Sequence, residues 1–205
     1  MIGQKLRGLV GQGMNGRRGK LTLAVYVYPP GTRTFTVPAS GKYRIAVRGS
    51  GGGGGSGGAG LAGSSGALVI GDRYLNKGQT VALVIGAPPG FNADGNASTA
   101  TFPDGSVMTA GGGGEGFTPN AAGVATSTNN LDTRLNGSLA TVAGLGNAGG
   151  TSGALTGGGA PGKDGFVGTS ATSGGLAQGP GAGGKPSNGN GGPGEVIIHQ
   201  ISMLP

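Results

Sequence analysis

The stretch that decides the fold of this chain is GGGGGSGGAGLAGSSG, residues 51–66. Glycine occupies every third position in it, and a shorter run at residues 159–168, GAPGKDGFVG, has the same spacing. A period of three is that of the polyproline II helix, which has three residues per turn and rises about 3.1 Å per residue. Glycine at each third position leaves one face of such a helix bare, so neighbouring backbones can approach closely. We therefore predict a bundle of extended helices held by ten structural glycines. They are Gly51, Gly54, Gly57, Gly60, Gly63 and Gly66 in the first run, and Gly159, Gly162, Gly165 and Gly168 in the second.

The composition limits what such a chain can be. Its 205 residues include 53 Gly and 12 Pro, and only 10% are charged and 4% aromatic. That much Gly and Pro is typical of low-complexity chains, but charge is too scarce for disorder driven by net charge. Few aromatic residues predict that a large hydrophobic core is not available. The chain has no Cys, which excludes disulfides and thiolate metal sites, and we expect no metal and no cofactor.

Positive charge is concentrated near the N-terminus. The net charge is +7, nine of the 14 Lys and Arg residues lie in the first 48 positions, and no Asp or Glu precedes Asp72. The segment 1–20 could dock on an acidic patch of a partner protein, or it could be a solvated arm. We do not expect nucleic acid, because the arm has no aromatic platform or recognisable binding module. We also expect no membrane span and no secretory signal, because no long apolar run is present. The candidate docking residues are Lys5, Arg7, Arg17, Arg18 and Lys20.

Strand patterns flank the glycine-rich parts. Runs of β-branched and aromatic residues, separated by turn residues, predict strands at residues 21–28, 32–37, 43–47, 67–70, 80–85, 99–102, 107–109 and 195–201. A short polar turn is expected after residue 70, and PDGS at 103–106 predicts a hairpin turn. The last strand is expected to join the N-terminal sheet and close the domain.

The predicted fold class is mainly β and irregular, with little or no α-helix. A small β-sheet region, made of the N-terminal strands and the C-terminal strand, would enclose the bundle of glycine-rich, polyproline II-type helices. Residues 1–34 are expected to form an attachment segment that includes the first strand. Residues 35–205 would form the glycine-rich domain, with strands over 35–110, the glycine region over 111–194 and the closing strand at 195–201.

Motifs for catalysis are absent or incomplete, so we predict that the protein is not an enzyme. Residues 49–54 match GxGxxG, but no helical pattern follows to bind a pyrophosphate. Residues 179–185 match GxxxxGK, but Pro186 stands where magnesium binding needs Ser or Thr. His199 is the only histidine, and no nucleophile, base and oxyanion group are brought together by the sequence.

Four stretches resemble one family. The stretch 35–47, FTVPASGKYRIAV, followed by poly-Gly, resembles the opening of the glycine-rich domain of bacteriophage tail-fibre and tail-tip proteins. Residues 78–86, 98–114 and 194–198 are similar to its next strand, its hairpin with a glycine block, and its closing strand. The long glycine segment is also similar to the polyglycine II adhesins of T-even-like phages.

This resemblance implies a virion protein, made in the host cytoplasm, that binds a host cell-surface receptor through loops between glycine-rich helices. The receptor would be a glycan or an outer-membrane or pilus protein, and the other partners would be tail-fibre or baseplate proteins. The candidate receptor loops are residues 87–97 and 115–143. Their candidate contact residues are Phe91, Asn92, Asp94, Phe117, Thr118, Asn120, Asn129 and Arg134. Phe91 and Phe117 could instead cap the ends of the bundle.

Several alternatives stay open at this point. A structural tail or baseplate component could share the fold without touching a receptor. An ice-binding protein could present a flat face of a glycine bundle, although Lys163, Asp164 and Phe166 interrupt the second glycine run. The protein could be a monomer on a trimeric stalk or itself a homotrimer.

Overall fold

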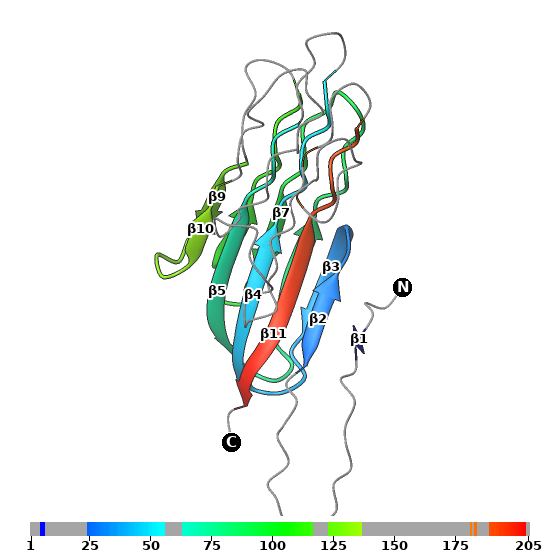
Figure 1. Ribbon diagram of the computed structural model, residues 1–205. Helices are drawn as coiled ribbons and strands as arrows, with labels where there is room; N and C mark the ends of the chain where they lie inside the picture. The colour runs from blue at the N-terminus through cyan, green and yellow to red at the C-terminus, as the bar shows by residue number, and fades with distance from the viewer. Residues whose placement is uncertain are drawn as a thin grey trace, which may run out of the picture.

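A computed structural model of the chain describes residues 5–6, 24–55, 63–116, 123–136, 181, 183 and 189–203. This part consists of two antiparallel β-sheets, packed face to face, and contains no helix. In these residues the predicted mainly β class, with little or no α-helix, is confirmed. Figure 1 shows the sandwich, with extended segments continuing from one of its ends.

Six strands form the first sheet, called sheet A here. In spatial order they are β1 (Lys5–Leu6), β2 (Val25–Tyr28), β11 (Glu195–Met203), β4 (Gly41–Arg48), β5 (Leu68–Leu75) and β10 (Thr133–Leu135). Five strands form sheet B. Their order is β3 (Gly31–Thr36), β6 (Thr80–Ile85), β7 (Ser98–Thr101), β8 (Val107–Ala110) and β9 (Ala125–Ser127).

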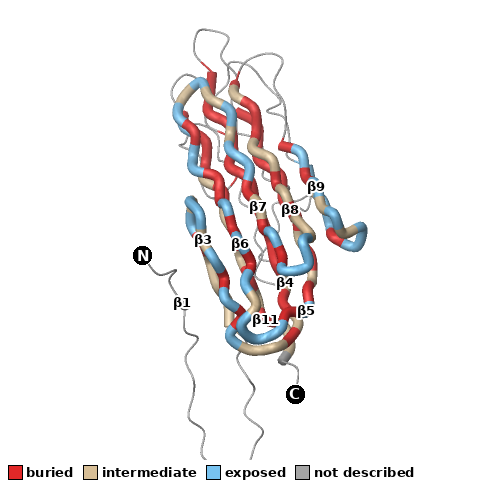
Figure 2. Tube along the Cα trace, turned by 180° about the vertical axis from the view of Figure 1, so that it is seen from behind, coloured by how far each residue is buried: buried red, intermediate tan, exposed pale blue. Residues whose placement is uncertain are grey.

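The core lies between the sheets and is larger than the composition predicts. Side chains alternate along the strands, as in β6, where Val81, Leu83 and Ile85 are buried and the residues between them are exposed. Among the few aromatic side chains in the core, the ring of Phe35 lies 5.7 Å from that of Tyr43, centroid to centroid, in an edge-on arrangement. The expectation that no large core is available is therefore wrong, because small aliphatic side chains from two sheets fill it without many aromatic rings. Figure 2 shows this buried interior extending along the strands.

The last strand closes the first sheet, as predicted. β11 lies between β2 and β4, and Ile197 is opposite Val27 on one side and Ala46 on the other. A register irregularity between Gln200 and Ser202 lies near the end of its pairing with β4. The C-terminal strand therefore holds the N-terminal strands together across the middle of sheet A.

Two parts of the strand prediction differ from the structure. The strand predicted at 67–70 continues to Leu75, because Asp72 and Arg73 alternate across the sheet instead of forming a turn. The stretch 115–143, expected to be a loop, contains β9 and β10. The predicted PDGS hairpin is present between β7 and β8, where Gly105 has a φ of 81° and Asp104 accepts a hydrogen bond from the Ser106 amide.

Other expectations bear on how the chain is divided. The expected boundary between residues 34 and 35 falls inside β3, and β2 lies next to β11 in sheet A.

In the part of the chain that the structure describes, no helix is long and apolar enough to cross a membrane.

The long connections share one end of the sandwich. The last residue of β4 is opposite the first residues of β5 and β11, so the chain leaves and re-enters sheet A at one place. The connections after β6 and β8 leave sheet B on the same side, where Gly194 bonds to Gly86 and Ala67 to Gly111. Figure 1 shows these segments side by side above the strands.

Candidate functional site: the glycine-rich end

The glycine end is the set of extended segments that stand on this end of the sandwich. Within the described residues it comprises 49–55, 63–67, 86–97, 111–116, 123, 181, 183 and 189–194. Residues 49–55 and 63–67 are all buried, although they consist of Gly, Ser and Ala (Figure 2). Their burial therefore comes from close approach of backbones and not from large side chains.

Segment 49–54 lies at the centre and donates its amides in three directions. Amides three residues apart donate hydrogen bonds to the same neighbouring segment. The six successive amides therefore donate to three neighbouring segments in turn. Residues 49 and 52 bond to Ala67 and Ser64, 50 and 53 to Asn96 and Ala93, and 51 and 54 to Gly192 and Gly189, with N to O distances of 2.8–3.0 Å. Such a repeat differs from a β-strand, whose amides alternate between two sides.

The carbonyls of the same segment reach a fourth neighbour. The Ser50 oxygen accepts from the Gly113 amide and the Gly53 oxygen from the Gly116 amide, each at 2.9 Å. The donors and the acceptors are again three residues apart. Segment 49–54 is thus surrounded by four extended segments that are far away in sequence, and main-chain hydrogen bonds join it to all of them.

Segment 49–55 requires glycine because the neighbouring backbones leave no space for a side chain. A Cβ atom at Gly49 would overlap the Gly111 oxygen, one at Gly52 the Gly114 oxygen and one at Gly55 the Gly116 backbone. None of these three glycines has a positive φ, so a side chain is excluded by the neighbouring backbone and not by the backbone conformation. Gly90, in the loop after β6, has no heavy atom within 4 Å of its Cβ position.

Ser50 shows what a side chain needs in order to fit here. It is fully buried, and its hydroxyl accepts a hydrogen bond from the Asn96 amide at 2.6 Å and contacts the Asn96 oxygen at 3.2 Å. A small hydroxyl can therefore replace glycine where it bonds to the adjacent backbone.

The predicted structural glycines are only partly within the described residues. Gly51, Gly54, Gly63 and Gly66 lie in the glycine end, and a Cβ at Gly63 or Gly66 would overlap the backbone of residues 49–53. The remaining six, Gly57, Gly60, Gly159, Gly162, Gly165 and Gly168, lie outside the described residues.

Three of the candidate receptor residues lie together in the loop after β6. Phe91 is half-buried, while Asn92 and Asp94 are exposed. The Asn92 amide donates to the Gly54 oxygen at 3.1 Å, and Asn92 has a φ of 55°. Asp94 Oδ1 accepts from the Glu115 amide at 2.8 Å, which joins this loop to segment 111–116. Phe117, Thr118 and Asn120 lie outside the described residues.

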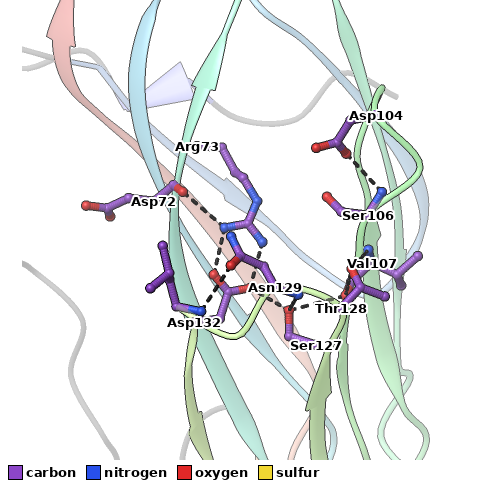
Figure 3. A network of polar contacts seen from close by, with 10 residues as sticks. Asp72, Arg73, Asp104, Ser106, Val107, Ser127, Thr128, Asn129 and Asp132 are labelled. Carbon is purple, nitrogen blue, oxygen red and sulfur yellow. Dashed lines mark hydrogen bonds and ion pairs between the residues drawn. The ribbon is translucent and has the colours of Figure 1, made fainter.

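Asn129 and Arg134 are not part of this group. They belong to the connection from β9 in sheet B to β10 in sheet A, whose turn follows β9 on the side away from the glycine end. Its Asp132 is buried and accepts two hydrogen bonds of 2.6 Å from Arg73, and Ser127 donates a third, as Figure 3 shows. The candidate loop 115–143 therefore includes a structural connection between the sheets, and its strands are too short to have a periodic pattern in the sequence.

Charged residues gather on the outward face of sheet A. Asp72 pairs with Arg44 at 2.8 Å and Lys42 at 2.9 Å, and the Arg44 hydrogen bond is the main cause that lowers the pKa of Asp72. Arg48 lies 3.6 Å from Glu195, where burial raises the pKa of the Glu195 carboxyl and lowers that of Arg48.

The basic arm is described only at β1, where Lys5 is opposite Tyr26 at the edge of sheet A. Arg7, Arg17, Arg18 and Lys20 lie outside the described residues.

Among the residues that the structure describes, no group of three or more His, Asp or Glu side chains could hold a metal ion. His199 lies on β11 opposite Arg44, on the charged outward face.

Comparison with models of protein families and with curated protein sequences gives no match to this chain.

Proposed function

We propose that this chain is a bacteriophage tail-fibre or tail-tip protein that binds a host cell-surface receptor through its glycine end. The observation that carries the proposal is the donor pattern of segment 49–54, whose amides serve three neighbouring segments in turn. Together with the resemblance of the sequence to phage glycine-rich domains, this pattern favours a polyglycine II-type bundle standing on a β-sandwich.

Backbone geometry supports the bundle. A polyproline II helix turns by a third of a revolution per residue, so successive amides point in three directions. The described glycines of segment 49–55 have no positive φ, in agreement with the negative φ of that helix. Ordering so much glycine costs backbone entropy, and main-chain hydrogen bonds to several neighbours help to offset that cost.

A bundle of this kind suits receptor display. Its stability depends on main-chain atoms, so the connecting loops can carry the side chains that determine specificity. The loop over 87–97 has exposed side chains at Asn92, Asp94 and Asn96, and its backbone is fixed by bonds to Gly54 and Gly113. An ordered loop with exposed polar groups loses little entropy on binding a glycan or a protein surface.

The alternative is a structural tail or baseplate component without a receptor contact. Two contacts within the protein favour it, because Phe91 is half-buried and Asp94 accepts a hydrogen bond from the Glu115 amide. These side chains are therefore less available to a receptor. The two functions differ in whether bulk added to the exposed loop changes binding to host cells.

The test measures binding of the labelled full chain to a panel of bacterial strains. Gly90→Gln adds a side chain at an exposed position with open space, and Pro103→Gln makes a matched change in the exposed β7–β8 turn at the opposite end. We expect saturable binding to some strains, weakened by Gly90→Gln and by Phe91→Ala and unchanged by Pro103→Gln. Absence of binding to every strain would favour the structural component, whereas equal binding by all variants would contradict a receptor contact through the loop over 87–97.

A further inference from the structure

The edge strands of the two sheets differ in length. In the described part of the chain, sheet A ends in β1 and β10, with two and three residues, and sheet B ends in β9, with three, and in β3, with six. An edge strand exposes main-chain N–H and C=O groups on which another strand can pair, and a short edge strand limits such pairing. Four of the six residues of β3 are exposed, namely Gly31, Thr32, Thr34 and Thr36. Of these edges, β3 therefore offers the longest surface to another strand.

Three residues of β3 direct their main-chain groups away from β6. The Val37 amide, one residue beyond β3, donates to the Gln79 oxygen at 2.9 Å, on the side of β6. Main-chain groups alternate in direction along an antiparallel strand, so every second residue counted back from Val37 also bonds toward β6. The residues between them, Thr32, Thr34 and Thr36, face the free edge of sheet B.

Arg33 reaches this free edge from the inside of the sandwich. It is opposite Leu83, whose side chain is buried in the core, so the half-buried Arg33 stands on the inward side of β3. Its guanidinium turns back to the main chain, where Nη1 donates to the Thr32 oxygen at 2.9 Å and Nη2 to the Pro30 oxygen at 3.2 Å. An acceptor of the free edge is thus already occupied, and a positive charge lies beside it.

Gly31 leaves room for the guanidinium. Its φ is 116°, and a Cβ there would lie 3.1 Å from Nη1 and 3.3 Å from Nη2 of Arg33. A side chain at residue 31 is therefore disfavoured both by the backbone conformation and by the guanidinium. Inward-pointing charges on edge strands are one of the devices that keep sheets from pairing with other chains.

We propose that Arg33 closes the free edge of sheet B to extended segments of other chains. An added strand has to displace the guanidinium from the Thr32 oxygen and then leaves a half-buried charge without this acceptor. The net charge of +7 repels further copies of the chain, but it does not repel an acidic segment. Arg33 acts against both, because strand addition depends on main-chain hydrogen bonds. This role does not depend on whether the chain binds a receptor.

The experiment measures binding of the full chain to a labelled synthetic peptide, EETVALVIEE, by fluorescence anisotropy. The peptide carries the sequence of β6, the strand that pairs with β3, between glutamates that the positive chain attracts. Arg33→Thr frees the Thr32 oxygen, and Thr34→Pro added to it removes an N–H group from the free edge. Arg134→Thr is the matched control, since it removes an exposed Arg from β10, a three-residue edge strand of sheet A.

We expect the dissociation constant of the peptide to fall at least ~tenfold in Arg33→Thr, because about one net main-chain hydrogen bond is gained. Loss of a positive charge alone would weaken binding of this acidic peptide, so the gain has the opposite sign from a charge effect. Addition of Thr34→Pro should restore the wild-type value, and Arg134→Thr should not tighten binding.

A second variant covers the case in which Arg33→Thr does not fold, as judged by circular dichroism. Arg33→Met keeps a long apolar stem inside the sandwich but donates no hydrogen bond, and it should bind the peptide as Arg33→Thr does. Equal binding by the wild type and the Arg33 variants, or binding by none of them, would overturn the proposal. A gain that persists with Thr34→Pro, or that Arg134→Thr reproduces, would overturn it too, because the peptide would then bind elsewhere.

Discussion

Arg73 and Asp132 tie the two sheets together at the edge formed by β5 and β9. The guanidinium of Arg73 on β5 donates two hydrogen bonds of 2.6 Å to the carboxylate of Asp132, which lies in the turn from β9 to β10. Arg73 also lies 4.8 Å above the centre of the Phe102 ring. Gly71 makes room for this pair, because a Cβ there would overlap Asp132 Oδ1. The chain therefore passes from sheet B to sheet A around a buried ion pair.

Removing one partner of this pair should destabilise the protein strongly. Asp132→Ala leaves the buried Arg73 guanidinium without its carboxylate, and we expect a loss of about 3–5 kcal/mol in the free energy of unfolding. Denaturant unfolding of the variant and the wild type measures it. The matched control is Asp72→Ala, whose partners Lys42 and Arg44 are partly exposed, with an expected loss of about 1 kcal/mol or less. Similar losses for the two variants would contradict the assigned role of the buried pair.

A methyl group in the centre of the glycine end should also be costly. Gly52→Ala places a Cβ against the Gly114 carbonyl, which belongs to the backbone and cannot rotate away. We expect a loss of about 1–3 kcal/mol, as for other overpacked sites, measured by thermal or denaturant unfolding. Gly90→Ala is the control, because its Cβ position is open and its φ is not positive, and it should leave stability unchanged or slightly raised.

The left-handed backbone of Asn92 gives a third prediction. Its φ of 55° is tolerated by Asn and by Gly but is strained for a β-branched residue. Asn92→Gly and Asn92→Val both remove the amide side chain, so their difference reports the cost of the backbone conformation. We expect Asn92→Val to be less stable than Asn92→Gly by about 1–2 kcal/mol in denaturant unfolding. Equal stabilities would mean that the loop takes another conformation.

Acid should weaken the protein partly through Asp72. Its pKa is lowered from 3.8, mainly by the Arg44 hydrogen bond, so the ionised carboxylate stabilises the folded state. This contribution is complete above the unfolded pKa of 3.8 and is lost as the pH falls through the lower folded value. Denaturant unfolding at a series of pH values should show a smaller loss for Asp72→Asn than for the wild type. Some slope should remain in the variant, since hydrogen bonds from Ser106 also lower the pKa of Asp104.

Long strands with regular alternation could be predicted from the sequence, and short ones could not. The predicted strand at 80–85 matches β6 residue for residue, because its apolar side chains alternate over six positions. β9 and β10 have only three residues each, which is too short for a periodic pattern. The sequence predicts a polar turn after residue 70 where β5 continues, since a sequence does not reveal that the charged side chain of Arg73 has its partner 59 positions away.

The glycine period predicts that extended backbones approach closely, but it does not predict which segments lie next to segment 49–54. It identified one face of the first run, while the structure places a neighbour against each face of segment 49–54. These neighbours come from residues 63–67, 92–96, 111–116 and 189–192, and no local pattern could relate segments so far apart in sequence. For the same reason the row of Thr32, Val84, Thr99, Thr109 and Thr126 across sheet B could not be recognised, because this row exists only once the register of five strands is known.

The threefold repeat of segment 49–54 restricts how its length can change during evolution. In the polyproline II-type bundle that we propose, an insertion of three residues would add one full turn and return every later amide to its former direction, whereas one or two residues would rotate all of them toward the wrong neighbour. Each added triplet would carry the outer loops about 9 Å farther from the sandwich. A glycine end built in this way would vary in height in steps of three residues, and its loops could move outward without any change in the sheets beneath them.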